Sequence, residues 1–192
     1  MWATMLLILA GPPERAPMPR PAAVALTADV AKKLQLIAFQ ACRDGDLETL
    51  KAFFAAGRPV NDTNARGDTL LTVAAYAGQA KAVALVLAQP KVDVDAKNGM
   101  GLTALAAAAF KGQPDIAKAL LKAKANANAA NGSGQTALMF AALAGKVDVA
   151  KVLLDAGADA KAADKAGNTP LSLARTQGAD DVAKLLEAHL KR

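Results

Sequence analysis

The apolar residues of this chain recur at the spacing of amphipathic helices. In residues 146–155, apolar side chains three or four positions apart fall on one helix face, with charged side chains between them. The same spacing returns in Ile116, Leu120 and Leu121, and again in residues 182–186. The pattern therefore predicts a series of short helices, each of which buries one face.

A glycine returns at a fixed period, at the end of an Ala-rich segment that precedes each of these helices. The five glycines are Gly45, Gly78, Gly112, Gly145 and Gly178, and by subtraction they are 33, 34, 33 and 33 residues apart. A period near 33 is typical of stacked helical repeats, in which each unit contacts only its neighbours. We expect each glycine to end a helix with a positive φ. The period predicts a solenoid with a long surface and no enclosed pocket.

The Ala-rich segments of the last four units begin alike. A threonine stands where a helix N-cap is expected, because its hydroxyl can accept a hydrogen bond from a backbone N–H two or three residues on. These threonines are Thr69, Thr103, Thr136 and Thr169. Asn and Asp residues follow each second helix and predict turns, since their short side chains bond the local backbone. The repeated unit is thus helix, tight turn, helix and extended hairpin loop.

This unit resembles the ankyrin repeat over roughly residues 34–190. The fourth unit matches best, through Thr136, Leu138, Ala141-Ala142, Gly145, Val149, Leu153-Leu154 and residues 156–159. The resemblance implies an all-α fold, an ankyrin-repeat solenoid of stacked helix-turn-helix units with hairpin loops. The histidine that bridges neighbouring repeats in the family is replaced by Thr72, Ala106, Met139 and Ser172. We therefore expect the repeat interfaces to depend more on apolar packing.

The resemblance divides the chain into a leader and a repeat domain. Residues 1–32 form an apolar leader and Pro-rich linker, and residues 33–192 form the ankyrin repeat domain. The repeats are expected at about 33–66, 67–99, 100–132, 133–165 and 166–190. The first lacks the threonine motif of the others, so it is interpreted as the N-terminal cap of the stack.

The leader has two interpretations. Residues 1–10 are apolar, and Ala23-Val24-Ala25 offers a signal-peptidase cleavage pattern, so the leader is interpreted as a signal peptide. This predicts a periplasmic or secreted protein. Against it, no Lys or Arg precedes the apolar run. The alternative is a leader without a targeting role and a cytoplasmic protein. In either case the apolar run is too short to span a bilayer, so no stable membrane span is expected.

The net charge of +6 suggests nucleic-acid binding until its location is considered. Residues 1–33 carry +2, the last two residues carry another +2, and the repeat body retains only +2. Nucleic-acid binding requires a basic stripe on one face. We see no such stripe in the sequence, and we expect no nucleic-acid partner.

The chain offers little for catalysis. It has one histidine, His189, in the predicted last helix, and one cysteine, Cys42, where other units have the second alanine of a pair. The cysteine is interpreted as a small buried thiol between helices. A lone His and a lone Cys do not form the usual zinc site. The chain is therefore predicted not to be an enzyme and to need no cofactor or metal.

In the ankyrin family, partners contact the hairpin tips and the exposed end of the first helix. Carried onto this chain, the partner-binding surface comprises Arg43, Arg66, Asp68, Tyr76, Met100, Leu102, Phe110, Lys111, Ser133, Gln135, Leu143, Lys165 and Asn168. Tyr76, Met100, Leu102, Phe110 and Leu143 are expected to form an apolar strip, with at least the two aromatic rings partly exposed. Interface centres are enriched in such side chains.

The sequence therefore predicts a non-enzymatic module, a monomer, that binds a protein partner on the concave face of repeats two to four. The alternative is an inhibitor, immunity or accessory protein that regulates a co-expressed enzyme, which would be periplasmic if the leader directs export. Both hypotheses use the same surface, and the sequence does not identify the partner.

Overall fold

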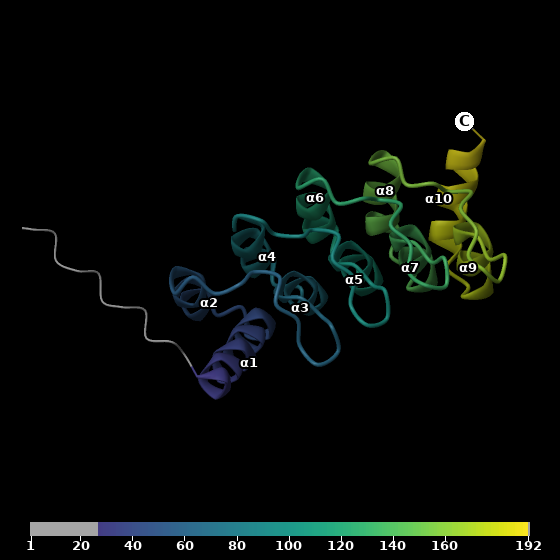
Figure 1. Ribbon diagram of the computed structural model, residues 1–192. Helices are drawn as coiled ribbons and strands as arrows, with labels where there is room; N and C mark the ends of the chain where they lie inside the picture. The colour runs from purple at the N-terminus through teal and green to yellow at the C-terminus, as the bar shows by residue number, and fades with distance from the viewer. Residues whose placement is uncertain (1–26, 192) are drawn as a thin grey trace, which may run out of the picture.

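The computed structural model describes residues 27–191, which form ten α-helices in sequential pairs (Figure 1). The helices are α1 (Ala28–Asp44), α2 (Leu47–Ala55), α3 (Leu70–Ala77), α4 (Ala80–Leu87), α5 (Ala104–Lys111), α6 (Pro114–Lys122), α7 (Ala137–Leu143), α8 (Val147–Asp155), α9 (Pro170–Thr176) and α10 (Asp180–Leu190). The predicted all-α fold of stacked helix-turn-helix units is confirmed.

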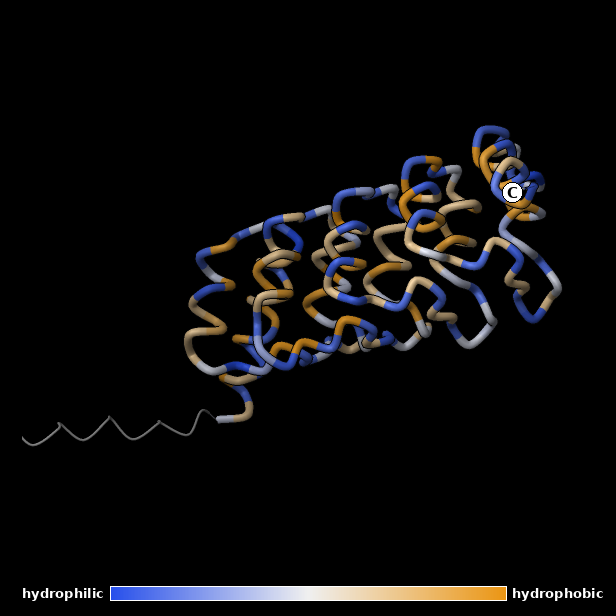
Figure 2. The backbone as a smooth tube through the Cα atoms, turned by 90° about the horizontal axis from the view of Figure 1, so that it is seen from above, coloured by the Kyte–Doolittle hydropathy of each residue, from blue (hydrophilic) through white to orange (hydrophobic). Residues whose placement is uncertain are grey.

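The helices lie in two rows. The odd-numbered helices contact one another in order, as do the even-numbered helices, and each odd helix packs against the even helix that follows it. Seen from above, the pairs succeed one another along one direction (Figure 2). A long loop descends from each of α2, α4, α6 and α8 and returns as a hairpin beside the odd row (Figure 1). We call the odd helices the inner row, because the hairpins project beside them.

The predicted helix ends are confirmed. The side chains of Thr69, Thr103 and Thr136 accept hydrogen bonds from the N–H three residues on, at 3.1, 3.2 and 3.4 Å. Thr169 does the same, with Pro170 in the first turn of α9. All five periodic glycines have positive φ, between 64° and 75°. These residues set the length of each inner helix at its two ends.

The core is built largely from alanine and leucine. The alanine pairs 74–75, 108–109 and 141–142 are fully buried, which lets neighbouring inner helices approach closely. Cys42 is also fully buried in the equivalent position of α1, so the interpretation of a small buried thiol is confirmed. At the positions of the missing histidine, Thr72, Ala106 and Met139 are buried as well. Apolar side chains therefore pack between neighbouring repeats.

The first repeat differs from the others. Helix α1 has 17 residues and begins at Ala28, before residue 33, where the domain is expected to start from the sequence. Leu36 and Ile37 of α1 are more than half exposed, which is consistent with a terminal repeat whose outer side has no neighbour. The predicted cleavage pattern and the apolar run lie outside the described residues. Among residues 27–191, no helix has the length and apolar character needed to cross a bilayer.

Candidate partner-binding groove

Each hairpin is held by one Asn or Asp side chain at its start. Asn64, Asn98, Asn131 and Asp164 lie three residues before the glycines of the hairpin tips. In every case the Oδ1 atom accepts hydrogen bonds from the backbone N–H groups two and four residues on, at 2.8 to 3.1 Å. The tips therefore have a defined conformation, and residues beside them are presented in fixed directions.

Neighbouring hairpins also contact each other. The N–H of Gly99 donates to the carbonyl of Arg66 at 2.9 Å. A Cβ atom on Gly67 would lie 2.8 Å from the Gly99 nitrogen, so only glycine allows this approach. Asn98 Nδ2 donates to a buried Asp68 oxygen at 2.7 Å. The first two hairpin tips are thus joined by backbone and side-chain hydrogen bonds.

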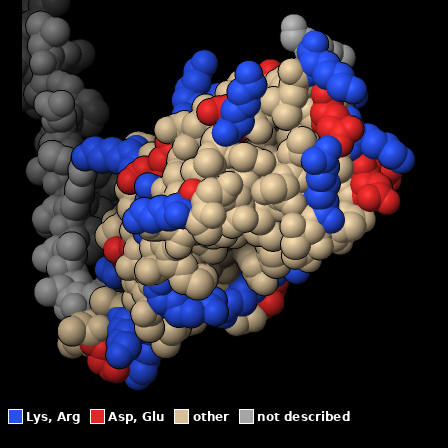
Figure 3. All heavy atoms as spheres, turned by 90° about the vertical axis from the view of Figure 1, so that its right-hand side faces the viewer, with Lys and Arg blue, Asp and Glu red and all other residues tan. Residues whose placement is uncertain are grey.

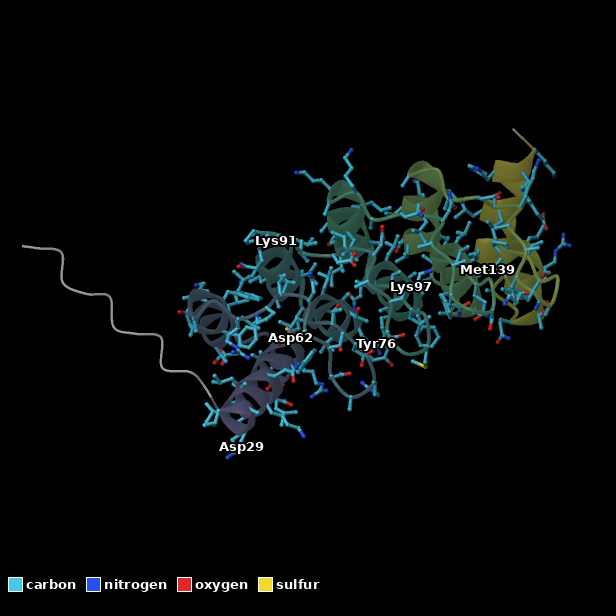
Figure 4. All side chains as sticks on the ribbon, in the orientation of Figure 1. Asp29, Asp62, Tyr76, Lys91, Lys97 and Met139 are labelled. Atoms are coloured by element: carbon cyan, nitrogen blue, oxygen red, sulfur yellow. The ribbon has the colours of Figure 1, made fainter. Side chains whose placement is uncertain are left out.

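Between these hairpins and the inner helices lies a groove with a volume of about 680 Å³. Its floor is formed by small and apolar residues of α3, α5 and α7, and its sides by aromatic, basic and hairpin residues. The lining comprises Arg43, Arg66, Asp68, Thr72, Val73, Tyr76, Ala77, Asn98, Met100, Leu102, Ala106, Ala107, Phe110, Lys111 and Phe140. Figure 4 places Tyr76 on the hairpin side of α3, and Lys91, in the turn after α4, on the opposite side of the stack.

Three large apolar side chains in this groove are open to solvent. Tyr76 is 52% exposed, Phe110 46% and Met100 68%. The expectation that both rings are partly exposed is confirmed. Single exposed apolar residues are ordinary, but several that line one groove form the kind of apolar surface on which proteins contact one another.

Basic side chains border the apolar floor. Lys111 Nζ lies 5.0 Å from the centre of the Tyr76 ring, in a cation–π arrangement. Arg66 is exposed, and its Nε donates to Asp68 Oδ2 at 3.1 Å. Arg43, at the end of α1, is exposed as well. The border of the groove is therefore positively charged.

Asp68, the one acidic residue of the lining, supports the hairpins. Its side chain is almost wholly buried and accepts hydrogen bonds from Asn64, Arg66 and Asn98. Burial on its own would raise the pKa of this carboxyl group, but the bonds from Asn98 and Asn64 and the charge of Arg66 outweigh it and lower the pKa. The sequence alone places Asp68 on the exposed tip, whereas the fold uses it to join two hairpins.

The groove contains eight of the thirteen residues predicted for the binding surface. The five that do not line it lie in the fourth and fifth repeats: Ser133, Gln135, Leu143, Lys165 and Asn168. Leu143, predicted to extend the apolar strip, is half-buried at the end of α7. Phe140 lines the groove instead, from the position that Val73 and Ala107 occupy in the two preceding repeats, where both also line it. The sequence signal that could have identified Phe140 is a large apolar residue one helical turn before the predicted row.

The rest of the described chain shows no arrangement typical of a catalytic centre. Burial raises the pKa of the Cys42 thiol to about 12, an effect larger than the opposing charge of Arg43, so the thiolate is absent at neutral pH. Within residues 27–191, no cluster of three His, Cys, Asp or Glu side chains is placed to hold a metal ion. The C-terminal end of the stack carries basic and acidic side chains around a broad uncharged surface (Figure 3).

Comparison with known families gives two overlapping matches. A model for ankyrin repeats (3 copies) matches residues 38–131, and a model for ankyrin repeats (many copies) matches residues 120–174. No curated protein sequence matches the chain. Together the two models extend from α1 to α9 and include all residues that line the groove.

Proposed function

The chain belongs to the ankyrin repeat family, whose repeats form protein-binding modules, and from this premise we propose that its groove is where a protein partner binds. The observation that carries the proposal is the group of exposed apolar side chains, Tyr76, Met100 and Phe110, in one groove whose hairpins are joined by hydrogen bonds. Rigid presentation of such anchors lowers the entropy lost on binding. The module binds without catalysis, and we expect it to act as a monomer.

The site is centred on the second and third repeats; Arg43 extends it to the first repeat and Phe140 to the fourth. This is narrower than the surface that the sequence predicts. Side chains of the last two hairpins would contact only the outer parts of a large partner. Interface energy is concentrated in central anchors, so the proposal assigns most of it to the two aromatic rings and Met100.

The test uses Phe110→Ala and a matched control. Truncation of an interface anchor costs about 2 kcal/mol or more, so Phe110→Ala should weaken partner binding at least about tenfold. Because Phe110 is half exposed, the helical content and melting temperature of the variant should change little. Leu36→Ala removes another exposed apolar side chain, on α1 and outside the groove, and should leave binding unchanged.

Both variants and the wild-type chain would be immobilised, and proteins captured from the native host would be quantified by mass spectrometry. A partner lost with Phe110→Ala and kept with Leu36→Ala supports the groove. Full binding by a folded Phe110→Ala variant refutes it. If the partner is an enzyme, its activity with and without this chain distinguishes an inhibitor or immunity protein from an adaptor.

We also propose that the protein is exported to the periplasm or secreted. The support is in the sequence alone: an apolar run in residues 1–10 and the Ala23-Val24-Ala25 pattern before the repeat domain. The intact mass of protein recovered from its native host tests this. A mature chain that begins after the Pro-rich stretch agrees with export, whereas a full-length chain confined to the cytoplasm contradicts it.

A further inference from the structure

Among residues 27–191, the groove lining contains three basic side chains and one acidic side chain whose hydrogen bonds are all internal. The basic groups are Arg43, Arg66 and Lys111, and the acidic one is Asp68. Asp44 follows Arg43 in the sequence but does not line the groove, and its carboxylate accepts two hydrogen bonds from Gln40. The groove therefore presents a positive border around an apolar floor.

Two of these cations have no carboxylate partner within the described part of the chain. The ion pairs there include Arg66 with Asp68, but none involves Arg43 or Lys111. Arg43 Nη1 donates to the neutral amide of Gln40 at 3.2 Å, and Lys111 lies over the Tyr76 ring. Both side chains are exposed and can pair with a ligand without breaking an internal ion pair.

We propose that the groove binds an acidic peptide segment of the partner, with a large apolar side chain on the floor and carboxylates against Arg43 and Lys111. The proposal rests on the function proposed above and adds the chemistry of the ligand. The floor supplies the apolar contact through Val73, Ala107 and Phe140, between the exposed rings of Tyr76 and Phe110. The positive border selects the sign of the flanking charges.

Charge disfavours two ligands that this chain itself could supply to the groove, a second copy of the chain and its own residues 1–26. A second copy carries a net charge of +6, and residues 1–26 carry Glu14 against Arg15 and Arg20. Both have the same sign as the border of the groove, so their approach is repulsive. A separate segment with negative charge is the complementary ligand.

A single-stranded nucleic acid is the other ligand with negative charge that stacks on aromatic rings. Its backbone repeats a charge at every nucleotide and requires a basic groove that follows it. Here the lining contains only three basic side chains, around an apolar floor. The geometry favours separate carboxylates around one apolar anchor.

The experiment selects ligands from a random library, so the partner need not be identified first. Displayed peptides of about a dozen residues, about 40 Å when extended, are selected on the immobilised full chain. Enriched peptides are then measured by fluorescence anisotropy against wild type, Phe110→Ala, and the double variant Arg43→Gln with Lys111→Gln. Lys161→Gln, which removes an exposed charge outside the groove, is the matched control. A labelled oligothymidine of similar length is measured in parallel.

We expect enriched peptides that combine Asp or Glu with an aromatic or large aliphatic residue. Each lost ion pair should weaken binding about two- to fivefold, so the double variant should lose about tenfold. The affinity should also fall when NaCl is raised from about 50 to about 500 mM, because salt screens these charges. Lys161→Gln should bind like wild type.

Three results would overturn the proposal. Neutral or basic peptides that require Phe110 would refute the acidic ligand but leave the groove as a protein-binding site. Absence of any peptide whose binding depends on Phe110 would refute both the acidic ligand and the groove. Binding of the oligothymidine that is lost in the double variant, without peptide binding, would identify a nucleic-acid site instead.

Discussion

The tips of the four hairpins hold Gly67, Gly101, Gly134 and Gly167. We call the hairpins of Gly67 and Gly101 the front hairpins and those of Gly134 and Gly167 the back hairpins. The two pairs have the same backbone scaffold but different side chains beside their glycines. In both halves, an N–H donates at 2.9 Å to the carbonyl of the hairpin before it, from Gly99 to Arg66 in front and from Lys165 to Ser133 at the back. In both, an Asn or Asp side chain bonds the tip.

The side chains on this scaffold differ. Arg66, Asp68, Met100 and Leu102 flank the front glycines and all line the groove. Ser133, Gln135, Ala166 and Asn168 flank the back glycines and do not. On the inner helices, the exposed rings of Tyr76 and Phe110 give way to Leu143 and Thr176 at equivalent positions. The repeated positions build the stack, whereas the positions that change from repeat to repeat determine which hairpins line the groove.

The largest expected effect is on hairpin stability, and it separates the first hairpin from the last, which no further hairpin follows among the described residues. Gly67 and Gly167 have φ of +77° and +81°, so alanine at either costs about 1–2 kcal/mol of unfolding free energy. At Gly67 the new Cβ would also lie 2.8 Å from the backbone nitrogen of Gly99, whereas at Gly167 it would meet no atom within 4 Å. Gly67→Ala should therefore be the more destabilising variant. It should lower the free energy of unfolding by at least about 2 kcal/mol in total.

Urea denaturation followed by circular dichroism measures this difference, and hydrogen exchange at the Gly99 amide reports on the contact between the front hairpins. Equal losses of stability in Gly67→Ala and Gly167→Ala would show that the front hairpins do not depend on their close approach.

The next prediction compares Met100 and Ser133, which stand before the tip glycine in a front and a back hairpin. Met100→Ala should weaken partner binding about tenfold, because it removes an anchor in the groove. Its melting temperature should not change, since the side chain is 68% exposed. Ser133→Ala should leave both properties unchanged, because only the backbone carbonyl of Ser133 bonds another hairpin. Titration calorimetry with the identified partner decides this, and equal losses in the two variants would extend the site into the back half.

Most of the fold could be predicted because its determinants are local and repeated. A threonine at the start and a glycine at the end of each inner helix act on neighbouring backbone groups, so their spacing alone gives the period. Recurrence at the repeat period could also have identified the residues that hold the hairpin tips, which are Asn64, Asn98, Asn131 and Asp164. Turn roles were predicted only for the Asn and Asp residues nearer the second helices. Those residues also join repeats, as in the 2.9 Å bond from Asp93 N to Asn61 Oδ1.

The site was less predictable because it depends on contacts between units. Alignment of the repeats gave equal weight to Phe110 and Leu143, although only the first lines the groove. It placed Asp68 at an exposed tip, because nothing local to residue 68 shows that Asn98 of the next hairpin binds its carboxylate. Phe140 was missed since the row of candidates was chosen one helical turn later. Whether such residues line the groove depends on the size of their side chains and on where the groove lies along the stack.

The smallest expected effect is a change in stability at low pH. It compares Asp68, in a front hairpin, with Asp164, in a back hairpin. Burial raises the pKa of both carboxyl groups, most strongly at Asp68, but hydrogen bonds, joined at Asp68 by the charge of Arg66, outweigh it and lower both pKa values. A carboxyl group with a lowered pKa in the folded state stabilises the protein above its unfolded pKa of about 3.9. That stability is lost as the pH falls through the folded pKa. The stability gap between wild type and each Asn variant should therefore be present at pH 7 and close below about pH 4.

The partners of the two carboxylates distinguish the halves. Asp68 accepts a bond from Asn98 in the neighbouring hairpin, whereas the bonds to Asp164 come from Ala166 and Asn168 in its own. Asp68→Asn should speed hydrogen exchange at the Met100 and Leu102 amides, because Asn98, which holds them, loses its charged acceptor. Asp164→Asn should change exchange only at residues 164–168. Exchange measured by NMR at pH 7 would reveal this, and a Met100 amide that is unaffected by Asp68→Asn would show that the front hairpins are held together by their backbone contact alone.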